Sequence, residues 1–161
     1  MVKAGFGLIE ISPLVGTPVA GYLNARYASG VHDPLFARAL ALTDGQTSAL
    51  LISFDLIGLA DADVVAIRKA VAERVPVDEQ HVILFCTHTH TGPALVDSFE
   101  TPRSDEYARS LPEKTARAAE TAWYDLAEAG VSFAQREVPG VAFQRRYLMK
   151  DGTVRTNPGK M

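Results

Sequence analysis

The chain has 161 residues, of which 47% are hydrophobic and 22% are charged, a composition that fits a globular domain and excludes disordered or collagen-like chains. Sixteen Lys and Arg residues against nineteen Asp and Glu residues give a net charge of −3. Because no basic run could follow a phosphate backbone, we expect no nucleic-acid partner. The single cysteine, Cys86, excludes an internal disulfide and a zinc site built from several thiolates.

The sequence predicts neither a membrane span nor an export signal. No apolar run approaches the ~18 residues that cross a bilayer, and residues 1–7 lack the continuous apolar segment of a signal peptide. We therefore expect a cytoplasmic protein.

The first third of the chain predicts a strand, a long loop and a hairpin. Phe6–Ile11 is strand-like and ends at Ser12-Pro13, and residues 15–31 are rich in Gly, Pro and Tyr without a sustained period. Long irregular loops in small domains are often functional. Leu35–Thr43 and Ser48–Phe54 are apolar runs separated by a segment with Asp-Gly, which predicts an antiparallel hairpin.

A strand, helix and strand follow one another between residues 50 and 86. Asp61 is suited to begin a helix in which apolar residues recur every three or four positions up to Pro76. His81–Cys86 is then an apolar run of strand length. Such a βαβ-like unit predicts that this strand lies parallel to Ser48–Phe54, with both strand ends at one edge of the sheet.

The last part of the chain predicts a second helix and two more strands. We expect the helix to run from Pro112 to Gly130 and the strands to be Val131–Ala134 and Val141–Gln144, with a turn at 150–153 and no element in 154–161. The predicted fold class is therefore α/β: a mixed β-sheet with a hairpin, a βαβ-like unit and flanking helices.

The segment Thr87-His88-Thr89-His90-Thr91-Gly92-Pro93 directly follows a predicted strand. If extended geometry continues, Cys86, His88 and His90 point to one face. Strand carboxyl ends are where open α/β sheets bind ligands, and a His-x-His pair there suits a catalytic metal. Two hydrogen-bonded polar residues at a strand end are an equally weighted interpretation, because a catalytic zinc needs about three protein ligands.

Other candidate residues are weaker. His32 ends the long loop, and Asp55 follows a strand at the same edge as His88, where its carboxylate could accept the second ring N–H of a ligand histidine. Both also have purely structural interpretations. Arg145 could bind an anionic or carbonyl oxygen, although surface arginines are common. Gly5-x-Gly7 precedes a strand, so it does not match a dinucleotide-binding fingerprint.

Several short strings together resemble the N-terminal part of the neutral/alkaline (non-lysosomal) ceramidases. The most specific is Thr87–Pro93, and the others agree in order and spacing across nearly the whole chain: Gly7–Pro13, Gly21-Tyr22, Gly30–His32 with Ala37–Ala39, and Ser53–Leu56. The resemblance implies that residues 1–161 are the N-terminal portion of a layered α/β catalytic domain.

The resemblance also implies a zinc amidohydrolase that cleaves the N-acyl bond of ceramide or a related lipid amide, and many such relatives are secreted. By motif, His88 matches a zinc ligand, His90 a histidine beside the reacting carbonyl, and Arg145 an active-site arginine. The match of His32 implies a supporting role. Gln144, Arg146 and Thr91 depart from the family pattern, which leaves the ceramide preference open.

The family's other zinc ligands and its nucleophilic serine lie beyond the matched region, so the one-zinc site is expected to be incomplete in this chain. Three hypotheses remain open. The chain is a zinc-dependent amidohydrolase, a shortened homologue that folds without catalysing, or a binding module that self-associates through an open sheet edge.

Overall fold

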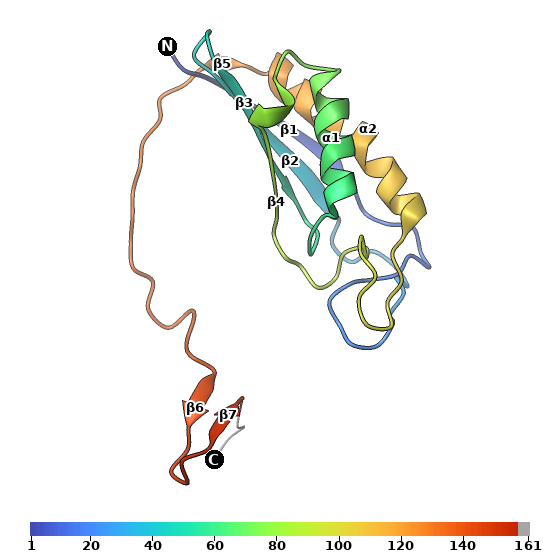
Figure 1. Ribbon diagram of the computed structural model, residues 1–161. Coiled ribbons are helices and arrows are strands. Elements are labelled where there is room, and N and C mark those ends of the chain that lie inside the picture. The colour runs from blue at the N-terminus through green and yellow to red at the C-terminus, as the bar shows by residue number, and fades with distance from the viewer. Residues whose placement is uncertain (158–161) are drawn as a thin grey trace. The chain divides into compact units, whose positions relative to one another are not determined.

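The protein is described from a computed structural model, which covers residues 1–157 and divides the chain into two units (Figure 1). The unit Met1–Gly130 holds a five-stranded sheet of order β4-β3-β2-β1-β5 and two helices. The strands of this sheet are β1 (Lys3–Glu10), β2 (Phe36–Thr43), β3 (Ser48–Phe54), β4 (Val82–Cys86) and β5 (Ala127–Glu128). The helices are α1 (Asp61–Ala72) and α2 (Asp105–Tyr124), with a short 3-10 helix at Glu79–His81.

The predicted α/β fold class is confirmed. β2 and β3 form the expected antiparallel hairpin, whose turn is closed by the Asp44 carboxylate, which accepts the N–H groups of Gln46 and Thr47. β3 and β4 pair in parallel, as the βαβ-like pattern predicts. The carboxyl ends of these two strands therefore lie together, with α1 as the crossover between them.

The predicted bounds of α2 are wrong. The helix begins at Asp105 and contains Pro112 in its interior, because Tyr107, Ala108 and Leu111 are already buried and continue the apolar stripe before the proline. Burial of that stripe outweighs the backbone hydrogen bond that proline cannot donate. The helix ends at Tyr124, before Gly130, since Ala127–Glu128 leaves it to pair with β1.

The second unit begins at Val131 and contains a two-stranded antiparallel sheet, β6 (Arg146–Leu148) and β7 (Val154–Thr156). The turn between them lies at 150–153 as predicted, but the predicted strands Val131–Ala134 and Val141–Gln144 are wrong. Their side chains are exposed, so no packed surface holds these segments in a sheet. β7 lies in the stretch 154–161 where no element was predicted, and 158–161 lie outside the described residues.

On the helix-covered face of the sheet, the side chains are small on β1 and β2 and large on β3 and β4. Gly7, Ala39, Ile52 and Leu84 are register partners in a row across β1, β2, β3 and β4. Helix α2 packs over the small residues of β1 and β2 (Figure 1). A Cβ on Gly7 would lie 2.0 Å from the carbonyl oxygen of Ala118, so the glycine lets helix and strand backbones touch.

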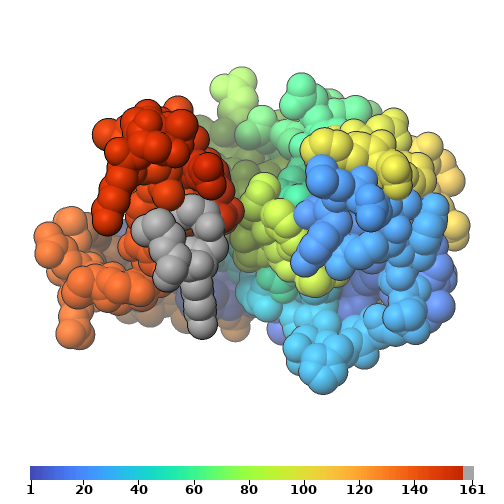
Figure 2. Space-filling model, turned by 90° about the horizontal axis from the view of Figure 1, so that it is seen from below, coloured from blue at the N-terminus to red at the C-terminus, as the bar shows by residue number. Residues whose placement is uncertain are grey.

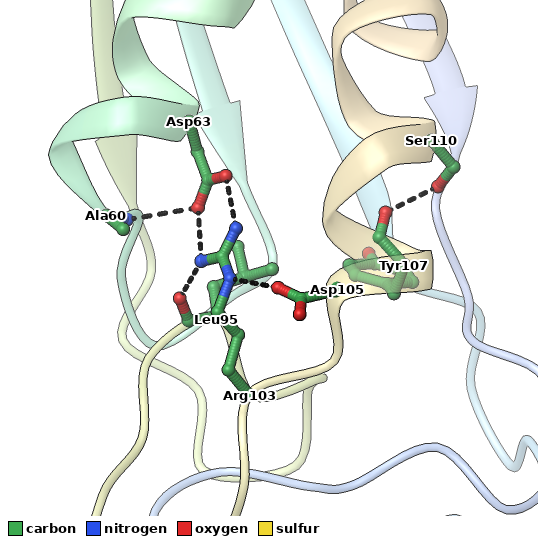
Figure 3. Close-up of polar contacts among 7 residues, drawn as sticks. All are labelled: Ala60, Asp63, Leu95, Arg103, Asp105, Tyr107 and Ser110. Atoms are coloured by element: carbon green, nitrogen blue, oxygen red, sulfur yellow. Dashed lines mark hydrogen bonds and ion pairs between the residues drawn. The ribbon is translucent and has the colours of Figure 1, made fainter.

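An ion-pair cluster joins the two helix N-termini (Figure 3). The Arg103 guanidinium donates to both carboxylate oxygens of Asp63, at 2.7 and 2.9 Å, to Asp105 at 2.8 Å and to the carbonyl of Leu95. Asp63 also accepts the N–H of Ala60, which precedes α1. One side chain thereby fixes α1, α2 and the connection after β4 relative to one another.

The opposite face of the sheet is apolar and carries no helix. Phe6 and Leu8 of β1 are 67% and 56% exposed there, and Ile83 and Phe85 of β4 are each 49% exposed. No helix of residues 1–157 is both long enough and apolar enough to span a membrane.

We expect Gly7→Ala to destabilise the protein by about 1–3 kcal/mol, because its methyl group would overlap the α2 backbone, which cannot move aside cheaply. The control is Gly30→Ala, where a Cβ meets nothing within 4 Å and φ is ordinary. Urea unfolding measures the difference in free energy. Equal stability of the two variants would show that α2 does not rest on β1 in this way.

We expect Arg103→Ala to lower the free energy of unfolding by about 2–3 kcal/mol. The loss is somewhat smaller than for a fully buried ion pair, because the Arg103 side chain is 24% exposed. The control is Lys69→Ala, which removes the exposed Lys69–Glu73 pair and should cost no more than about 0.5 kcal/mol. Thermal and urea unfolding of both variants test the ranking. The cluster would have no structural role if the two variants unfolded alike.

Candidate functional site

The segment after β4 turns sharply at the first of its two histidines. Thr87 still pairs with β3, its N–H donating to Phe54, but His88 has a φ of 63°, in the left-handed region. The expectation that Cys86, His88 and His90 alternate along one extended strand is therefore wrong. Such a φ is unusual for a residue with a side chain, and it is sustained here by the hydrogen bonds that His88 makes.

His88 is attached to the connection between β3 and α1. Its backbone N–H donates to Leu56, and its ring Nδ1 lies 2.9 Å from the carbonyl oxygen of Ile57. A carbonyl oxygen can only accept, so Nδ1 must carry the proton. The lone pair of the neutral ring is then on Nε2, the state in which imidazole binds a metal.

His90 is held in the same way by the long N-terminal loop. Its Nδ1 lies 2.8 Å from the carbonyl oxygen of Gly21, so Nδ1 is again the donor and Nε2 keeps the lone pair. Arg26 donates to the carbonyl of His90 at 2.7 Å, and its guanidinium lies 3.6 Å over the ring of Tyr22. The Tyr22 ring meets that of His90 edge-on at 6.3 Å.

The turn brings the two imidazoles together. Their ring centres are 5.1 Å apart with an interplanar angle of 70°, and both residues are exposed. Two imidazoles bound to one tetrahedral zinc at about 2.0–2.1 Å have ring centres about 5 Å apart. Because each Nδ1 is held by a carbonyl, Nε2 is the nitrogen of each ring that could bind a divalent metal.

The loop of residues 15–31 packs against the histidine segment, as Figure 2 shows for the blue and yellow-green surfaces. Ala20 donates to Gly92 and Ala94 donates to Pro18, each at 2.9 Å. Sequence reasoning did not identify Arg26 or the aromatic role of Tyr22. Gly21-Tyr22 is one of the strings that resemble the ceramidases, but no sequence pattern points to Arg26.

Within residues 1–130, neither Asp55 nor His32 makes a hydrogen bond to the histidine pair. Asp55 accepts the N–H of Phe36 at 2.9 Å and pairs with Arg38 at 2.7 Å, while the Ile57 carbonyl takes the place beside His88. His32 is exposed in the loop before β2. Arg145 belongs to the second unit, where its carbonyl accepts the N–H of Asn157. The roles of Asp55, His32 and Arg145 stay predictions.

Cys86 is half-buried at the end of β4. Burial raises the pKa of its thiol to about 11, so the sulfur is protonated near neutral pH. Within residues 1–157, no group of three or more His, Cys, Asp or Glu side chains is arranged to hold a metal.

A cavity of about 510 Å³ lies elsewhere, between residues 12–18 and the first turns of α2. Its polar lining includes Thr17, Ser104, Glu106 and Lys114, and neither histidine of the pair lines it.

The fold and this loop define an α/β domain with a histidine pair at the carboxyl end of a parallel strand. No protein-family model matches the chain, and no curated protein matches it either. Among solved structures, it is similar to neutral ceramidase from Pseudomonas aeruginosa, with a TM-score of 0.69 and 21% identity over 78% of this chain and 22% of that one.

A ceramidase structure described as complexed with C2 is also similar, with a TM-score of 0.64 and 21% identity over 78% of this chain and 21% of that one. The chain therefore shares the fold of part of neutral ceramidase, as the resemblance predicts. It spans about a fifth of the length of these ceramidases.

We expect Gly21→Ala to disturb the His90 ring. Gly21 has a φ of +103°, and a Cβ there would lie 2.5 Å from the Cβ and Cγ atoms of His90. Gly16→Ala is a matched control, because its φ is +90° but a Cβ meets nothing within 4 Å. Imidazole nitrogen NMR should report the hydrogen bond from His90 Nδ1 in wild type and Gly16→Ala, and a changed His90 signal only in Gly21→Ala. The same His90 spectrum in all three proteins would contradict the contact.

Proposed function

We propose that this chain is a ceramidase-like domain that contributes His88 and His90 to a zinc-dependent amidohydrolase site. The observation that carries the proposal is the pair of ring tautomers: each Nδ1 donates to a backbone carbonyl and each Nε2 is left as an acceptor. The shared fold with part of neutral ceramidase adds support, although the activity of that protein is not carried over by fold alone.

In this proposal His88 would hold the zinc through Nε2, and its Nδ1 bond to Ile57 orients the ring. Bound zinc would supply Lewis-acid polarisation of an amide carbonyl. The His90 ring is fixed by its hydrogen bond to Gly21, and its centre lies 5.1 Å from the centre of the His88 ring. From there the Nε2 lone pair of His90 can accept a proton from the attacking group.

The substrate class we propose is a lipid amide, with ceramide as the first candidate. The Tyr22 ring beside His90 is 53% exposed and offers an apolar surface next to the reacting position. Arg145 would bind the carbonyl oxygen or a headgroup oxygen. Because Thr91, Gln144 and Arg146 depart from the family pattern, the proposal extends to lipid amides with headgroups other than that of ceramide.

A second function is favoured by two observations. In the described part of the chain no third metal-binding side chain joins the histidines, and one sheet face is apolar and open. A homologue that folds without turning over substrate and acts by binding or assembly, including self-association through an open sheet edge, fits both.

We expect zinc to perturb the Nε2 signals of His88 and His90 in the 161-residue protein, and His88→Ala to weaken zinc binding by at least about tenfold. His81→Ala is the control, since His81 is an exposed histidine of the 3-10 helix just before β4, away from the carboxyl end of that strand. Imidazole NMR during a zinc titration and metal analysis after dialysis measure the effect. Equal weakening by the two substitutions would refute the assignment of the ligand.

Hydrolysis of a fluorescent N-acyl sphingosine with added zinc separates the two functions. Fatty-acid release that His88→Ala and His90→Ala abolish, but His81→Ala does not, supports the amidohydrolase. Zinc binding without release supports the homologue that binds but does not catalyse. Release that survives His88→Ala would refute the zinc mechanism.

A further inference from the structure

The two edges of the five-stranded sheet differ in how they are protected. One edge is formed by the two residues of β5, one of them Glu128, which pair with Lys3 and Ala4, and by the remainder of β1, where Gly7 packs on the α2 backbone and the Phe6 N–H is bonded to Asp125. The other edge is β4, Val-Ile-Leu-Phe-Cys, which contains no charge, proline or glycine. By these criteria β4 is an unprotected edge.

The backbone groups of β4 that face away from the sheet can be assigned. Thr87 donates its N–H to Phe54 of β3, and the direction of backbone groups alternates along a strand, so Ile83 and Phe85 also face β3. The N–H and C=O groups of Val82, Leu84 and Cys86 therefore face outward. Of these, the Val82 carbonyl accepts a bond from Arg68 Nε at 2.9 Å, which covers one end of the edge.

We propose that a second copy of this chain adds its own β4 to this edge, antiparallel and about a two-fold axis at Leu84. This inference rests on the second function proposed above, assembly through an open edge, and is independent of the zinc site. Leu84 would exchange two backbone hydrogen bonds with Leu84 of the partner subunit. On each side of the axis the Val82 N–H would donate to the carbonyl of Cys86 of the partner subunit, while the Val82 carbonyl keeps its bond to Arg68 Nε.

The side chains of β4 are complementary to themselves in this register. Ile83 would lie opposite Phe85 of the partner subunit, and Phe85 opposite Ile83 of the partner subunit. Both residues are 49% exposed on the uncovered face. Pairs of an aromatic with a β-branched residue are among the favourable cross-strand combinations, and the two-fold axis makes this pair twice.

The alternative is association of two whole apolar faces. Phe6 on β1 is more exposed than Phe85, and β1 lies on the far side of β2 and β3 from the β4 edge, with the Phe6 N–H bonded to the Asp125 carboxylate at 2.9 Å. A substitution at Phe6 therefore tests the face without touching the edge.

Sedimentation equilibrium of the 161-residue protein across a wide range of concentrations tests the proposal. We expect a monomer–dimer equilibrium whose dissociation constant rises at least about tenfold in Phe85→Lys and is unchanged in Phe6→Lys and His88→Ala. Loss of the dimer in Phe6→Lys would assign association to the face, and a monomer at every concentration would reject the edge. Neither result bears on zinc binding by His88, which is measured separately.

Disulfide trapping tests the register without destabilising charges. In a Cys86→Ser background, Ile83→Cys and Phe85→Cys are made as separate proteins with the new thiols on the exposed face. Mixed and oxidised, they should form a disulfide between positions 83 and 85, whereas either protein alone should cross-link much less. Efficient cross-linking of Ile83→Cys to itself would show a different register, and no cross-link in the mixture would overturn the pairing.

Discussion

The structure depends on how closely helix α2 approaches the sheet. Gly5 and Gly7 leave no side chain between β1 and the carbonyls of Ala122 and Ala118. The alanines of β2 and the larger residues of β3 continue the same surface, so the helix layer is close over β1 and farther away toward β4. This change in side-chain size fixes where each helix can lie, because α2 can approach closely only over the small residues of β1 and β2, and bulky residues fit only under α1.

That packing places the N-termini of both helices at the end of the sheet where the parallel strands β3 and β4 finish. Arg103 then joins Asp63 at the start of α1 to Asp105 at the start of α2 and to the connection at Leu95. The connection that Arg103 holds is the continuation of the histidine segment. Its other support is the long N-terminal loop, through the Ala20–Gly92 and Ala94–Pro18 hydrogen bonds.

The sequence predicted those parts of the fold that local patterns determine. The Asp44-Gly45 turn and the apolar periods of β2, β3 and α1 are local patterns. The strand pairing that they predict, β3 with β2 and with β4, is correct. The start of α2 was missed because Pro112 is a local signal that buried contacts of Tyr107 and Leu111 outweigh. No local pattern explains why residues 5 and 7 are glycines, because the reason is the contact of β1 with the α2 backbone. The histidine pair was found, but the turn at His88 depends on partners about thirty residues away, which no local period encodes.

The two histidines are oriented by main-chain carbonyls and not by carboxylates. Asp55, the carboxylate that the sequence suggested, is already committed to Arg38 and Phe36. A carbonyl fixes the tautomer and direction of a ring without adding a negative charge near a bound cation. The geometry of the pair therefore depends on the backbone positions of Ile57 and Gly21, which belong to two different connections. It follows that a substitution that shifts either connection changes the site even when no side chain of the pair is touched.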